Sequence, residues 1–158
     1  MSDVGIEIHG ADELIAKYGR IREQLPASMK RTMVRSVIYA QGQIPAYPAP
    51  PAGSSYRRTG TLGRVVTAFP GHSGPRSLGG GGGDNGGTPL TRVEAMGGGV
   101  KGVIGGRLSY LPYVIGDDSG GGQAWMHSGR WWILEKVIAG ARGGIARLWQ
   151  SDMKHLFD

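Results

Sequence analysis

Half of the positions in residues 71–88, GHSGPRSLGGGGGDNGGT, are glycine. Leu78 is its only large apolar residue. Burial of side chains therefore cannot offset the conformational entropy lost when the segment is ordered. We expect residues 71–88 to form a mobile loop inside one domain that spans residues 1–158, because 158 residues suffice for a single core.

The segment before this loop predicts a strand and two helices. Residues 4–9 alternate apolar and polar side chains, which is the pattern of a short, half-buried strand. Apolar residues then recur at helical spacing after Asp12, and again after Pro26, whose ring suits the first turn of a second helix. The first apolar stripe consists of Leu14, Ile15, Tyr18, Ile21 and Leu25, and the second of Met29, Met33, Val37, Ala40 and Ile44.

Four further segments have the composition of strands. Residues 61–69 are rich in β-branched side chains, and residues 90–96 and 100–104 flank three glycines that suit a hairpin turn. Residues 110–116 contain Pro112, which cannot donate a backbone hydrogen bond, so we expect an edge strand or an extended segment there.

A long amphipathic helix is predicted over residues 130–158. Gly143 and Gly144 are expected to kink or divide it, because each glycine costs about 1 kcal/mol relative to alanine in a helix interior. The predicted fold class is therefore α+β. An antiparallel sheet of about four strands packs with an N-terminal helix pair and a C-terminal helix, and the loops are long and rich in proline or glycine.

The charge of the chain favours polyanionic partners. It has 18 Lys and Arg against 12 Asp and Glu, a net charge of +6 and a pI of about 9.9. The absence of cysteine excludes disulfides, cysteine-ligated metals and thiol nucleophiles. The N-terminus lacks the pattern of a secretory signal, and no apolar run approaches the 18 or so residues of a membrane span.

No motif predicts an enzyme. The glycine run is not followed by the Lys-Ser or Lys-Thr of a phosphate loop, and Gly71-His72-Ser73-Gly74 continues with Pro75, where a nucleophile elbow has glycine. The four histidines are too far apart in sequence for a paired metal motif, and Asp117-Asp118 is typical of a solvated turn. We expect no catalytic residue, no metal and no cofactor.

Loop prolines, aromatic residues and arginines remain as candidates for a subunit interface. Four of the nine prolines fall in residues 45–60, the proline-rich strap, which also contains an Arg-Arg pair. Aromatic residues and arginine are enriched at interfaces because they bury a large area for a small loss of entropy. The candidate interface residues are Tyr47, Pro48, Pro50, Pro51, Tyr56, Arg57, Arg58, Thr59, Tyr110, Pro112, Tyr113, Trp125 and Arg130.

The order of several short motifs resembles a family of bacteriophage proteins. These motifs are GADEL, YPAPPAGSSYRRTGTL, YLPYVIG and HSGRWWILEKV, and the glycine-rich stretch departs from the pattern as an insertion. The family comprises the tail-completion or head–tail joining proteins of long-tailed bacteriophages, which are neck and minor tail components.

This resemblance implies a non-catalytic virion subunit that assembles in the host cytoplasm into a homo-oligomeric ring of six copies. Its expected partners are a head-side connector or stopper and a tail terminator or tail tube protein. The ring would surround the DNA channel, where basic residues contact genomic DNA without reading its sequence. No membrane partner is expected. The alternative is a small basic nucleic-acid-binding module, which stacks bases on loop aromatics.

Overall fold

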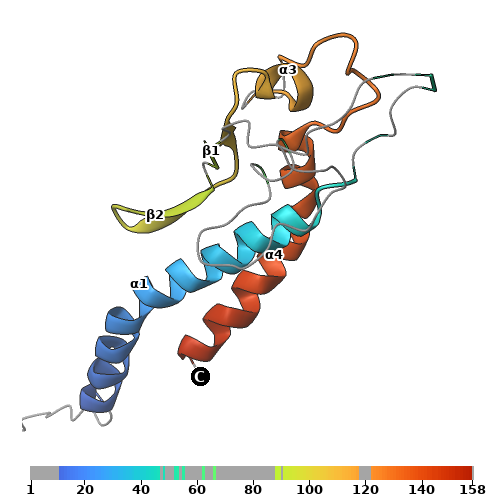
Figure 1. Cartoon of the computed structure of the whole chain (residues 1–158). Helices are drawn as coiled ribbons and strands as arrows, with labels where there is room; N and C mark the ends of the chain where they lie inside the picture. Colours follow the sequence, from blue (N-terminus) through green and yellow to red (C-terminus); the bar gives the residue numbers. More distant parts are fainter. Residues whose placement is uncertain are drawn as a thin grey trace, which may run out of the picture.

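The computed structural model of the chain describes residues 11–46, 48, 52–53, 55, 62, 66, 88–89, 91–117 and 122–157. The elements are α1 (Ala11–Gly42), β1 (Thr88–Pro89), β2 (Arg92–Met96), β3 (Gly99–Val103), β4 (Gly106–Arg107), α3 (Leu111–Ile115) and α4 (Leu134–Phe157). Helices and antiparallel strand pairs occur together, which confirms the α+β class. Figure 1 shows an elongated molecule in which α1 and α4 lie side by side in opposite directions, with α3 at the end opposite the first turns of α1.

The predicted N-terminal helix pair is in fact one helix. Helix α1 has 32 residues, and Pro26 lies in its interior. A proline there removes one backbone hydrogen bond and crowds the preceding turn, which bends a helix without necessarily ending it. Good helix formers such as Leu25 and Ala27 flank the proline, so the helix continues. The first turns of α1 accordingly run at an angle to the rest of the helix (Figure 1).

The C-terminal helix is confirmed, and its glycines do not divide it. Helix α4 is continuous over 24 residues, and Gly144 is buried against Tyr39 of α1. A Cβ atom at Gly144 would lie 2.2 Å from the Tyr39 hydroxyl oxygen. The glycine therefore lets the tyrosine ring lie against the backbone of α4, and this close packing offsets its low helix propensity.

The predicted hairpin is also confirmed. Strands β2 and β3 pair antiparallel with Val93 opposite Gly102, and the turn contains Gly98 at φ +82°. A Cβ atom at Gly102 would lie 2.7 Å from Val37 Cγ2 and 2.8 Å from Met33 Sδ. The hairpin therefore packs closely on α1, with Met33 filling the space beneath it. Strands β1 and β4 form a second pair of two residues each.

Two predicted strands are wrong where the structure describes them. Residues 111–115 form helix α3, because Pro112 lies in the first helical turn, where its missing N–H leaves no hydrogen bond unmade. Leu62 and Val66, the two described residues of the predicted strand over residues 61–69, are helical and buried. The predicted strand over residues 4–9 and the glycine-rich residues 71–87 lie outside the described residues.

The hydrophobic core lies where the C-terminal end of α1 meets α3 and the start of α4. Its buried members are Ile44, Leu62, Val66 and Ile115, and half-buried residues such as Leu134 pack around them. Gln41 links this core to neighbouring segments, because its buried amide donates to the Val66 carbonyl at 2.8 Å and to the Thr91 hydroxyl at 3.3 Å.

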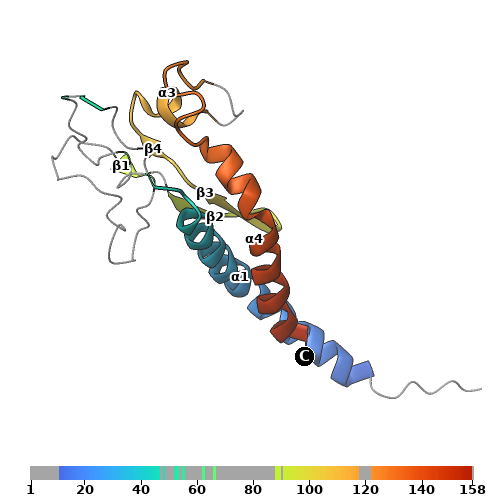
Figure 2. The same cartoon turned by 90° about the vertical axis from the view of Figure 1, so that its right-hand side faces the viewer.

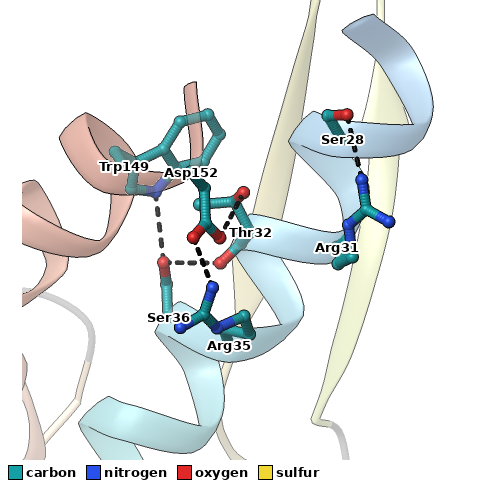
Figure 3. Close-up of polar contacts among 7 residues, drawn as sticks. All are labelled: Ser28, Arg31, Thr32, Arg35, Ser36, Trp149 and Asp152. Carbon is teal, nitrogen blue, oxygen red and sulfur yellow. Dashed lines mark hydrogen bonds and ion pairs between the residues drawn. The ribbon is translucent and has the colours of Figure 1, made fainter. Parts of the chain in front are cut away.

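Polar side chains connect α1 to α4 farther along the two helices. The Trp149 indole N–H donates to Ser36 Oγ at 3.1 Å, and the Ser36 hydroxyl donates to the Thr32 carbonyl at 2.8 Å (Figure 3). The Thr32 hydroxyl donates to Asp152 Oδ2 at 2.9 Å, and Arg35 forms an ion pair with the same carboxylate. These contacts form only when the two helices are aligned as observed. They therefore favour one register of α4 along α1.

We expect Asp152→Ala to destabilise the chain by about 1–3 kcal/mol, because it removes the acceptor of the fully buried Thr32 hydroxyl. The ion pair contributes less, since the Arg35 side chain is 52% exposed. Urea denaturation followed by circular dichroism measures the change. Ser151→Ala, at the exposed neighbouring position, is the control, and an equal shift in both variants would contradict the prediction.

Candidate subunit interface

The described part of the predicted interface gathers at one end of the molecule, around α3. Tyr110 precedes α3, Pro112 and Tyr113 lie within it, and Trp125 and Arg130 lie in the loop that follows. Pro48 is half-buried in the strap. The remaining candidates lie outside the described residues: Tyr47, Pro50, Pro51, Tyr56, Arg57, Arg58 and Thr59.

Hydrogen bonds hold the loop of residues 122–130 against α3. The Ala124 N–H donates to the Tyr113 carbonyl at 2.8 Å, and the Gln123 side-chain amide donates to the Val114 carbonyl at 2.8 Å. The same amide donates to the Trp131 carbonyl at 3.2 Å. Gln123 therefore ties α3 to the segment that leads into α4, and the Ala124 bond places the backbone of the loop next to Tyr113.

Consecutive turns in residues 124–131 leave one tryptophan half-buried and another exposed. The N–H of His127 donates to the Ala124 carbonyl at 2.8 Å, and that of Trp131 donates to the His127 carbonyl at 2.9 Å. The His127 ring packs edge-on against Trp131 at 5.8 Å, so Trp131 is half-buried. Trp125 points outward instead and is 85% exposed.

We call this region the distal surface. It consists of Tyr110, Tyr113, Trp125, Met126 and Arg130, all of which are exposed. Tyrosine, tryptophan, methionine and arginine are the side chains most enriched in protein interfaces. The distal surface is therefore the candidate subunit interface within the described residues.

An open pocket of about 540 Å³ adjoins the distal surface. It lies between the loop and the first turn of α4, and Trp131, Trp132 and Val137 form its apolar part. Its charged lining residues are Arg130 and Lys136, both exposed. The pocket therefore suits an apolar side chain that has an acidic residue next to it.

The structure shows a second exposed apolar surface that the sequence reasoning missed. Leu14, Ile15 and Tyr18, predicted as part of an apolar stripe that would pack inward, are 55%, 69% and 59% exposed. They belong to residues 11–25 of α1, which we call the arm. Figure 2 shows the arm extending past the C-terminal end of α4, where Lys17 Nζ donates to the Phe157 carbonyl at 2.5 Å.

A length mismatch in the sequence could have revealed the arm. The two apolar stripes before the proline-rich strap run from residue 14 to residue 44, whereas the stripe of the C-terminal helix runs only from residue 131 to residue 149. At a rise of about 1.5 Å per residue, the shorter helix cannot cover all of the longer one. Part of α1 is therefore left without this partner, and in the structure that part is the arm.

Neither a candidate metal centre nor a candidate membrane span is found among the described residues. No group of three or more His, Cys, Asp or Glu side chains among them is placed to hold a metal ion. Within the same part of the chain, no helix has the length and apolar character needed to span a membrane.

Comparison with known proteins gives no relative. The chain matches no protein-family model, no curated protein and no solved structure. The resemblance to phage head–tail joining proteins therefore depends on the short sequence motifs alone.

Proposed function

We propose that this chain is a structural subunit that assembles into a homo-oligomeric ring at the head–tail junction of a tailed bacteriophage. The observation that carries the proposal is the placement of its exposed large apolar side chains. Among the described residues, nine large apolar side chains are exposed, and all but Met96 lie in the arm, at the end of α4 or on the distal surface. Large exposed apolar patches mark interaction sites. The first turns of α1 and the region of α3, which carry most of these side chains, lie at opposite ends of an elongated subunit (Figures 1 and 2).

The sequence motifs supply the proposed location. They resemble tail-completion and neck proteins, so the ring would join a head connector or stopper to a tail terminator or tail tube. The net charge of +6 suits a ring that surrounds DNA, because non-specific binding to phosphates needs no base-reading motif.

The alternative function is a small nucleic-acid-binding module, and one observation favours it. Trp125 is 85% exposed in the same loop as the exposed Arg130. Exposed aromatic side chains next to cations can stack on the bases of single strands. In that case the distal surface would bind DNA or RNA instead of protein.

Native mass spectrometry of the purified chain, followed by negative-stain imaging, tests the proposal. We expect closed rings with a central channel. A chain that stays monomeric, both alone and with purified neck and tail tube proteins, contradicts the proposed function. A tight, salt-sensitive complex between the monomer and free single-stranded DNA would support the nucleic-acid-binding module.

A further inference from the structure

We propose that the arm of one copy docks head-to-tail on the distal surface of the next copy. Leu14, Ile15 and Tyr18 would pack against Tyr113, Trp125 and the adjoining pocket. This inference rests on the self-assembly in the proposed function, but not on a location within a virion. It assigns a partner to each of the two exposed apolar surfaces.

The arm continues a stripe that is already an interface within the chain. Residues 14, 18, 21, 25, 28 and 32 follow the alternating spacing of four and three residues that keeps side chains on one face of a helix. Ser28 and Thr32, in the part of α1 beyond Pro26, are buried, and Thr32 bonds to Asp152 of α4. Tyr18 and Leu14 occupy the same stripe past the end of α4, where they are exposed. An apolar partner is therefore needed to complete the stripe.

The distal surface of the same copy cannot be this partner. Tyr18 and the end of α1 at Gly42 are 24 residues apart, which corresponds to about 36 Å of helix. Just beyond that end, Ile44 packs in one cluster with Ile115 of α3. The arm lies at one end of α1 and the distal surface lies beyond its other end, so a second copy is needed to bring them together.

The two surfaces also match in charge. The first turn of α1 contains Asp12 and Glu13, immediately before Leu14 and Ile15. The pocket beside the distal surface has an apolar part flanked by Arg130 and Lys136. Docking of the arm tip in this pocket pairs acidic residues with basic ones while it buries the two apolar side chains.

Head-to-tail docking accounts for both surfaces with one contact. A symmetric pairing of two arms would cover Leu14, Ile15 and Tyr18 but leave Tyr113 and Trp125 exposed. A contact between two different surfaces repeats from copy to copy, and it closes into a ring when the rotation between copies allows closure. The assembly expected from the two surfaces is therefore a ring or a helical filament.

Cysteine cross-linking tests the contact cleanly, because the natural chain has no cysteine. We expect Tyr18→Cys protein mixed with Tyr113→Cys protein to give a disulfide-linked dimer under mild oxidation with copper phenanthroline. Each variant alone should stay monomeric on a denaturing gel, and a chain with both substitutions should give a ladder of multimers. The control pair is Tyr18→Cys with Lys101→Cys, an exposed position on β3, and it should not cross-link.

Other results overturn the inference in distinguishable ways. Dimers from Tyr18→Cys alone would show arm-to-arm pairing. Oligomers by native mass without a cross-link between positions 18 and 113 would overturn the head-to-tail contact and leave the proposed function standing. A monomer under all conditions would contradict both.

Charge reversal provides a second, independent measurement. Asp12→Lys with Glu13→Lys should weaken self-association roughly tenfold or more, and so should Arg130→Glu with Lys136→Glu. Mixing the two reversed proteins restores opposite charges across the contact, so a mixed complex should recover. A mixture that associates no better than either reversed protein alone contradicts the pairing of these charges.

Discussion

Gly144→Leu is expected to lower the free energy of unfolding by about 3 kcal/mol, which would be among the largest effects of any single substitution in the chain. A Cβ atom at this position would lie 2.2 Å from the Tyr39 hydroxyl oxygen and 2.3 Å from Cζ of the same ring. The ring must therefore leave its place between α1 and α4, or the helices must separate. Because a domain of this size is stable by only about 5–15 kcal/mol, urea denaturation followed by tryptophan fluorescence should show a clear shift of the midpoint.

The neighbouring glycine offers a matched control. Gly143 is exposed, and the nearest atom to a Cβ built there is Arg147 Nη1 at 3.8 Å. Gly143→Leu should leave stability unchanged or raise it by up to about 1 kcal/mol through better helix propensity. Adding Tyr39→Ala to Gly144→Leu should recover part of the loss, since the two side chains no longer compete for one space. Equal destabilisation at both glycines would contradict the explanation.

The elements predicted correctly from sequence are those in which local pattern and tertiary packing agree. The hairpin of β2 and β3 follows from β-branched residues around three glycines, and α4 follows from a long apolar stripe. Pro112 illustrates the opposite case, because proline is compatible both with an edge strand and with the first turn of a helix. Packing of Ile115 in the core favours the helix, and this packing cannot be predicted from the local sequence.

Pro26 and Gly144 show a related limit. Each residue disfavours a helix interior, so the sequence predicts a boundary or a break near each. In the structure α1 and α4 pack along each other, and this contact stabilises both helices through the unfavourable positions. The cost of glycine or proline in a helix interior is about 1–3 kcal/mol, which is similar to the contribution of one tertiary contact. Packing between the helices can therefore override it.

The sequence selects residues of the distal surface as a candidate interface but does not select the arm. Tyr113 and Trp125 are candidates because the loops hold more aromatic residues than one small core needs. In the structure both are exposed, and Trp125 follows Ala124, whose N–H donates to the Tyr113 carbonyl. The exposure of Tyr18 was not predicted, because a stripe of apolar residues on a helix looks the same whether or not a neighbouring helix reaches it. The relative lengths of α1 and α4 are the feature that indicates that α4 does not cover all of α1.

Tyr18→Glu is expected to weaken self-association roughly 100-fold, because it places a charge in the centre of the proposed contact, where hot-spot substitutions cost most. The monomer should keep its helical circular dichroism signal and its urea midpoint, since Tyr18 is 59% exposed. Analytical ultracentrifugation across a concentration series measures the change. Gln24→Glu adds the same charge to the arm at an exposed position outside the apolar stripe, and it should leave association within a few-fold of the natural chain.

Trp125→Ser should reproduce the loss from the opposite surface, because Trp125 is the most exposed aromatic residue of the distal surface. If both residues belong to one contact, the double variant Tyr18→Glu with Trp125→Ser should associate hardly less than either single variant, since the contact is already lost. Additive losses would instead place the two residues in separate contacts, and the head-to-tail arrangement would be wrong. If Trp125→Ser weakens binding to single-stranded DNA and leaves self-association unchanged, the distal surface is a nucleic-acid site.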